Sequence, residues 1–160
     1  MSKNLFSAAA FTLIALILNS CSLSNKEVIF PENELPISIP FAGNTYVTES
    51  LGSEFIDNYT GKFKNDWTDK DMKMSTYFRV GASGELNIGF EGSNKSGSSV
   101  IRFTVDGKEY DVEVTGDTTS LYGITTTNKT APGYVRIGFQ GMSKTGDTFG
   151  EITHFRIGGQ

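Results

Sequence analysis

Cysteine and histidine are almost missing from this chain. Its 160 residues include one of each, Cys21 and His154, which excludes a disulfide framework and a zinc site made of cysteine and histidine ligands. A surplus of basic charge is missing too. Lys3 is one of the 14 basic residues and lies in the first 20 residues. The rest of the chain therefore has 13 basic and 18 acidic side chains. Without net positive charge to neutralise phosphates, we do not expect a nucleic-acid partner.

The chain has one long hydrophobic run, and it is too short to span a membrane. Residues 5–18 are uncharged and mostly apolar, and they follow a short start that carries Lys3. As a helix this run would be roughly 21 Å long, against the ~30 Å hydrocarbon core of a bilayer. The pattern is typical of a signal peptide, which we predict over residues 1–20.

The residues after this run resemble the bacterial lipobox. Leu18 lies three positions before Cys21, and the small Ser20 directly precedes it. The resemblance implies that the signal is cut before Cys21, whose sulfur is acylated to anchor the protein in a membrane. Ser22 in place of aspartate is similar to the sorting rule of enteric bacteria and implies the outer membrane. The alternative is a buried free cysteine near an N-terminal helix.

The remaining chain divides into a tether and one domain. Residues 21–35, which begin with the lipidated cysteine, are mostly polar and show neither a helical nor a strand period. We predict a flexible tether there. Residues 36–160 are long enough for a single folded domain.

Hydrophobic residues in this domain alternate with polar ones. Met74, Thr76 and Phe78, for example, fall on one face of a strand and Tyr77 on the other. Asp106-Gly107 suits the tight turn of a hairpin. We predict an all-β fold, an antiparallel, jelly-roll-like β-sandwich of eight or nine strands. The expected strands are 36–41, 45–48, 71–80, 84–92, 101–105, 110–114, 121–125, 134–140 and 151–157.

Catalytic patterns are not found. With Cys21 assigned to lipid, no cysteine remains to pair with His154, and no serine-based triad signature surrounds this histidine. We expect His154 to be a hydrogen-bonded strand residue. A glycoside hydrolase remains an alternative, but it needs two carboxylates about 5 to 10 Å apart, which sequence spacing does not establish.

Three carboxylates cluster around the single tryptophan. Asp66, Asp69 and Asp71 lie within six residues, and such oxygen ligands are a candidate calcium site. The spacing is not that of an EF-hand. A solvated turn, capped by the same side chains, explains the cluster equally well.

Several aromatic residues lie outside the alternating core pattern. Tyr59 and Trp67 fall in a polar segment, residues 49–70, that we predict to be a surface loop, and Tyr77 points to the outer face of its strand. Aromatic rings can stack on sugars, and Asp69 can accept hydrogen bonds from sugar hydroxyls. We therefore predict a carbohydrate site at Trp67, Tyr59, Tyr77 and Asp69. The alternative for Trp67 is a lid folded onto the core.

Several strings together resemble the family called domain of unknown function 5077. They are residues 39–48, 75–80, 84–87, 132–136, 140–146 and 149–152, and the resemblance extends over about residues 36–158. It implies a β-sandwich like that of carbohydrate-binding modules, without established catalytic residues. The family occurs in secreted bacterial proteins, usually ahead of a larger domain suspected of acting on glycans. No such domain follows in this sequence, so we expect any joint action to occur in trans or not at all.

These observations lead to one main hypothesis. We expect a lipid-anchored, non-catalytic protein of the bacterial cell envelope that binds carbohydrate. The alternatives are a structural or interaction lipoprotein with an envelope protein as partner, and a polysaccharide hydrolase. No cofactor is expected beyond the candidate calcium.

Overall fold

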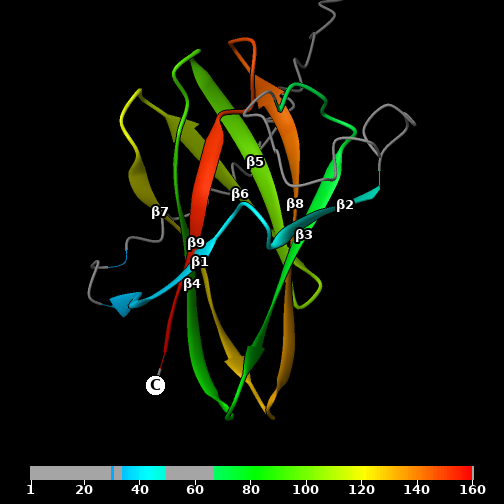
Figure 1. Cartoon of the computed structure of the whole chain (residues 1–160), viewed down its shortest axis with the longest axis vertical. Helices are drawn as coiled ribbons and strands as arrows, with labels where there is room; N and C mark the ends of the chain where they lie inside the picture. The colour runs from blue at the N-terminus through cyan, green and yellow to red at the C-terminus, as the bar shows by residue number, and fades with distance from the viewer. Residues whose placement is uncertain (1–29, 31–33, 50–66, 160) are drawn as a thin grey trace, which may run out of the picture.

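The computed structural model describes residues 30, 34–49 and 67–159 of the chain. They form two antiparallel sheets packed face to face (Figure 1). The predicted all-β sandwich is confirmed, and each of the nine expected segments coincides with a strand. The strands are β1 (Ile37–Pro40), β2 (Thr45–Glu49), β3 (Lys73–Val80), β4 (Gly84–Ser93), β5 (Ser98–Val105), β6 (Lys108–Thr115), β7 (Ser120–Lys129), β8 (Gly133–Lys144) and β9 (Glu151–Gly159). Within the described ranges, no helix has the length and apolarity to cross a membrane.

The strand order is that of a jelly roll with one added strand. One sheet has the order β1-β9-β4-β7, and the other has the order β2-β3-β8-β5-β6. If β2 is set aside, successive strands alternate between the sheets everywhere except at the β5–β6 hairpin. In Figure 1, β1 and β2 lead the chain from the first sheet to the second.

The β5–β6 hairpin has the turn that the sequence predicted. Val105 pairs with Lys108, so Asp106 and Gly107 alone form the loop. Their φ angles are 49° and 77°, and positive values at both positions are required in a type I′ turn. Glycine adopts this backbone conformation freely, and aspartate tolerates it better than most residues.

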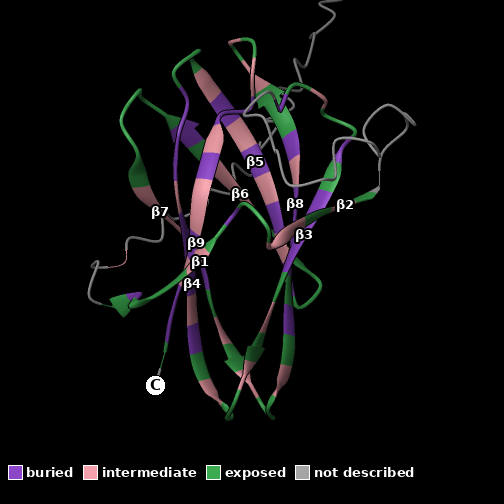
Figure 2. Cartoon of the chain, in the orientation of Figure 1, coloured by how far each residue is buried: buried purple, intermediate pink, exposed green. Residues whose placement is uncertain are grey.

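Aromatic residues from both sheets meet in the core. Buried residues alternate with more exposed ones along the strands (Figure 2). The ring centroids of Phe90 on β4 and Phe103 on β5 lie 4.9 Å apart, and those of Phe139 on β8 and Phe155 on β9 lie 5.5 Å apart. These contacts join the inner faces of the two sheets, as expected for a sandwich.

One buried side chain packs on the outside of the four-stranded sheet. Leu35 is fully buried, although it is not part of the core between the sheets. It covers Gly89, where an added Cβ atom would lie 3.0 Å from Leu35 Cδ1. Arg156 donates a hydrogen bond from Nε to the Leu35 carbonyl oxygen at 3.1 Å. The folded unit therefore includes Leu35, the last residue of the flexible tether that the sequence predicts.

Candidate functional site

A row of small side chains crosses the outer face of the five-stranded sheet. Ser75 on β3, Gly138 on β8 and Thr104 on β5 lie directly opposite one another in the strand register. The row ends at Tyr46 on β2 and Glu109 on β6. Because opposite residues of antiparallel strands project to the same side, small residues in mid-row leave a depression between the larger neighbours.

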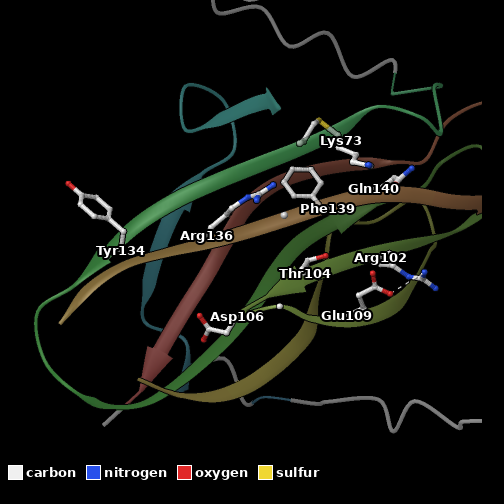
Figure 3. A pocket seen from close by; sticks show the side chains of 12 residues that line it. Lys73, Arg102, Thr104, Asp106, Glu109, Tyr134, Arg136, Phe139 and Gln140 are labelled. Carbon is white, nitrogen blue, oxygen red and sulfur yellow. Dashed lines mark ion pairs between the residues drawn. The ribbon is translucent and has the colours of Figure 1, made fainter. Parts of the chain in front are cut away.

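This depression, which we call the outer hollow, has a volume of about 570 Å³. This size is in the range of pockets that bind small molecules. In Figure 3, Tyr134 stands at one end of the lining and the Arg102–Glu109 ion pair at the other. The lining residues are Lys73, Met74, Arg102, Thr104, Asp106, Gly107, Glu109, Tyr134, Arg136, Gly138, Phe139 and Gln140.

Arg102 is held in place by two carboxylates of β6. Its Nε and Nη2 atoms donate to the two carboxylate oxygens of Asp111 at 2.7 and 2.8 Å, and its Nη1 atom lies 3.3 Å from Glu109 Oε2. The hydrogen bonds from Arg102 lower the pKa of Asp111 below its ordinary value of 3.8, against the opposing effect of burial. The charge of Arg102 is thus neutralised within the protein, and this wall of the hollow is preorganised.

Removing the Asp111 charge is expected to destabilise the fold in a pH-dependent manner. A lowered folded pKa stabilises the native state at pH values above the unfolded pKa, and this contribution disappears as the pH falls through the folded pKa. We expect Asp111→Asn to lower the free energy of unfolding by about 1 kcal/mol at neutral pH, because both partners are partly exposed. The difference from the parent should vanish in acid, as measured by urea unfolding at a series of pH values.

A neighbouring residue on the same strand serves as the control for this prediction. Glu113 on β6 is exposed, and Glu113→Gln makes the same chemical change outside the pair. Its effect should stay within about 0.5 kcal/mol at every pH. A difference between Asp111→Asn and the parent that stays constant down to pH 2 would contradict the stabilising role of the charge.

Arg136 forms the opposite wall together with Tyr134. Arg136 donates a hydrogen bond from Nε to the Ser75 hydroxyl oxygen at 2.9 Å. An added Cβ atom on Gly138 would lie 3.7 Å from Arg136 Nη2, so the guanidinium group extends beside the floor of the hollow. Nearby, Asp106 is engaged by Lys129, whose Nζ atom lies 3.1 Å from Asp106 Oδ1.

Three tyrosines are exposed on this same face of the sheet. Tyr134 is 75% exposed, Tyr46 48% and Tyr77 44%. Tyr134 lines the outer hollow. Tyr77, which the sequence predicted as a glycan contact, lies beside the hollow, directly opposite Arg136 across the β3–β8 ladder. The face therefore presents aromatic rings next to the hollow, and the role of Tyr77 as a glycan contact stays a prediction.

Trp67 is a core residue and does not present its ring to solvent. Its side chain is 3% exposed, and its ring centroid lies 5.2 Å from that of Phe149 and 5.9 Å from that of Phe139. Its Nε1 atom donates to the Asp69 carbonyl oxygen at 3.1 Å. The prediction of Trp67 as a stacking platform must be corrected. The structure has the alternative arrangement, in which the indole closes one end of the core.

The other predicted site residues are only partly described. Asp69 Oδ1 accepts a hydrogen bond from the Asp71 backbone amide at 2.8 Å, the arrangement of an Asx turn. Asp66, Tyr59 and Cys21 lie outside the described residues. Within the described ranges, no three carboxylate, histidine or cysteine side chains form a metal-binding group. Asp69 therefore has a turn-capping role, and the calcium site stays a prediction.

The segment that carries Asp69 is attached to the end of β8. Gln140 donates from Nε2 to the Lys70 carbonyl oxygen at 2.8 Å, and Lys144 donates from Nζ to the Thr68 carbonyl oxygen at 3.0 Å. The Phe149 amide donates to the Trp67 carbonyl oxygen at 2.8 Å. Because Gln140 also lines the outer hollow, the segment 67–71 borders this site.

His154 lies on β9, as predicted, but its Nδ1 atom lacks the expected hydrogen bond. This buried atom is 3.4 Å from Glu91 Oε2 and has no hydrogen-bond partner among the described residues. Glu91 is also paired with Arg156, whose Nη1 atom lies 3.0 Å from Glu91 Oε1. The three side chains lie on the four-stranded sheet, away from the outer hollow.

Most residues of the hollow are not among the site residues predicted from the sequence. Tyr134, Arg136 and Gln140 occupy the outward positions of a strand whose inward positions the sequence predicts. The same alternation would have placed all three on one surface. It does not reveal that Arg102 and Thr104 lie beside them. The alternation of residues within one strand does not determine which strands are neighbours in the sheet.

The family model described as Domain of unknown function (DUF5077) matches residues 39–160. The chain belongs to this family. The resemblance noted from the sequence is thereby confirmed. A search of curated proteins found no match to this DUF5077 chain.

Two solved structures are similar to this chain. The "GH26-CBM35 beta-(1,4)-mannanase" of Podospora anserina is similar at a TM-score of 0.50 with 13% identity, over 79% of this chain and 28% of that enzyme. The family 35 carbohydrate binding module from Clostridium thermocellum has a TM-score of 0.41 with 19% identity, over 82% of this chain and 97% of the module. This chain spans little more than a quarter of the mannanase, and at such low identity the similarity to the mannanase concerns the fold alone.

Proposed function

We propose that this DUF5077 protein is a non-catalytic carbohydrate-binding protein of the bacterial cell envelope and that the outer hollow is its binding site. The observation that carries the proposal is the exposed ring of Tyr134 beside a depression lined by polar side chains. The matching family and the carbohydrate-binding-like sandwich support the ligand class. Lipid attachment at Cys21 and an outer-membrane location belong to the same proposal and rest on the sequence.

The walls of the hollow provide complementary contacts for a sugar. The ring of Tyr134 offers an apolar surface against which the C–H face of a pyranose can pack. Lys73 and Arg136 can donate hydrogen bonds to hydroxyl oxygens, and Glu109 can accept them. Few contacts of this kind on an open surface give modest affinity, with a dissociation constant between about micromolar and millimolar.

A larger side chain on the floor should block binding without unfolding the domain. An added Cβ atom on Gly138 would have only ordinary contacts, the nearest at 3.6 Å to Thr104 Cβ, so the backbone tolerates substitution. The rest of a glutamine side chain would extend into the hollow. We expect Gly138→Gln to weaken polysaccharide binding about tenfold or more, while the loss of a glycine within a strand leaves stability equal or slightly higher.

The binding measurement is native affinity electrophoresis in gels that contain glucomannan, xylan, dextran or polygalacturonate. Gly133→Gln is the matched control, because Gly133 lies on the same strand, outside the hollow, with no atom within 4 Å of an added Cβ. It should migrate like the parent protein. Full binding by Gly138→Gln would locate the site elsewhere, and the absence of retention in all four gels would count against carbohydrate binding.

A further inference from the structure

Two adjacent strands of the outer face carry basic residues and no acidic ones. Lys73 and Arg79 on β3 and Arg136 on β8 project to the face that carries the hollow. Neither strand contains an acidic residue. The acidic residues of this face that line the hollow are Asp106 and Glu109, and both belong to the β5–β6 hairpin. The basic residues of β3 and β8 and the charges of both signs on the β5–β6 hairpin therefore meet along the hollow.

The ion pairs of the hollow leave one guanidinium group without a counter-charge. Arg102 is neutralised by Asp111 and Glu109, and Asp106 is neutralised by Lys129. Arg136 takes part in no ion pair with any described residue, and its protein partner is the neutral hydroxyl of Ser75. That hydrogen bond uses Nε alone and leaves the Nη1 and Nη2 groups as donors toward the ligand.

This arrangement fits an anionic group better than a neutral hydroxyl. A guanidinium group binds a carboxylate or sulfate with two parallel hydrogen bonds, and such charge-assisted bonds are stronger than neutral ones. Tyr77 lies directly opposite Arg136 across the ladder, and Tyr134 lies two residues away along β8. Tyrosine rings and an unpaired arginine side by side can contact both the ring and the charged substituent of an acidic sugar.

We infer that the outer hollow selects anionic glycans, whose carboxylate or sulfate groups bind Arg136. This inference rests on the proposed carbohydrate-binding function and names the ligand class. The net charge of the whole chain is −4, so general electrostatic attraction does not bring a polyanion to this protein. Binding of an acidic polymer would require a local site of the kind that Arg136 provides.

The test compares polymers that differ in charge. Polygalacturonate and its methyl-esterified form share a backbone and differ in free carboxylates, while dextran sulfate and dextran differ in sulfate esters. We expect the protein to bind at least one charged polymer about tenfold or more tightly than its neutral counterpart. Preference within the first pair identifies a carboxylate ligand, and preference within the second pair identifies a sulfate ligand.

Variants then assign the preference to one side chain. Arg136→Gln should lose the preference for the charged polymer, and Arg136→Lys, which keeps the charge but not the fork of donors, should lose part of it. Lys95→Gln is the charge control, because Lys95 is exposed between β4 and β5 and does not line the hollow. It should retain binding within about twofold, since an exposed charge that does not contact the ligand has a weak, screened effect.

Three outcomes would overturn the inference. Equal affinity for charged and neutral polymers would contradict the ligand class and leave the proposed function intact. Equal loss with Arg136→Gln and Lys95→Gln would indicate general charge attraction instead of a site at Arg136. A lack of binding to every polymer, charged or neutral, would reject the proposed function together with the inference.

Discussion

Replacing Trp67 with alanine is expected to lower the free energy of unfolding by about 3–5 kcal/mol, the usual cost of deleting a large buried aromatic side chain. The indole is 3% exposed and packs against Phe139 and Phe149. Its Nε1 hydrogen bond to the Asp69 carbonyl oxygen would be lost as well. Urea unfolding followed by circular dichroism measures the effect directly, because it does not depend on the fluorescence of the removed tryptophan.

Tyr134→Ala provides the opposite case. Because Tyr134 is 75% exposed, its removal should change stability by no more than about 0.5 kcal/mol, yet it should abolish polysaccharide retention. At a temperature where Trp67→Ala remains folded, that variant should still bind. If Trp67→Ala were as stable as the parent and lost binding, the indole would act at the surface, contrary to its position in the core.

The position of Trp67 shows why its role was ambiguous in the sequence. Its neighbours in the chain are polar, and polar surroundings favour a surface loop over a core position. The partners that bury it, Phe139 and Phe149, lie more than 70 residues away in the chain. When burial depends on residues far away in the chain, the local pattern of polar and apolar residues does not predict it.

Local patterns, in contrast, were sufficient for the strands and for the tightest turn. The alternation at Met74, Thr76 and Phe78 identifies the inner face of β3, and the Asp106-Gly107 pair identifies the β5–β6 hairpin. Both depend on residues that are close in the chain. The outer hollow differs, because its floor combines Gly138 with Thr104, which become neighbours only when β5 pairs with β8.

The second large effect is expected at Gly158 on β9. An added Cβ atom at this position would overlap the Glu34 carbonyl oxygen and lie 3.2 Å from Leu35 Cα. No rotation of a side chain relieves a contact with backbone, so Gly158→Ala must displace the segment that covers the sheet. We expect a loss of about 2–4 kcal/mol in the free energy of unfolding, comparable to losing a buried leucine.

Gly133→Ala makes the same chemical change where there is room. No atom lies within 4 Å of its added Cβ, and stability should remain equal or rise slightly. Hydrogen exchange adds a local measurement. In Gly158→Ala the amides of β1, which pairs with β9 next to the displaced segment, should exchange faster than in Gly133→Ala.

A double-mutant cycle tests whether Gly158 and Leu35 act together. Leu35→Ala alone should cost about 2–4 kcal/mol, because Leu35 is fully buried against the sheet. If Gly158→Ala acts by displacing Leu35, the two costs will not add, and the double variant should be little less stable than either single variant. If the two losses in the free energy of unfolding add, Gly158→Ala destabilises β9 without acting through Leu35. Coupled costs would show that Leu35 stabilises the folded unit through its packing next to Gly158.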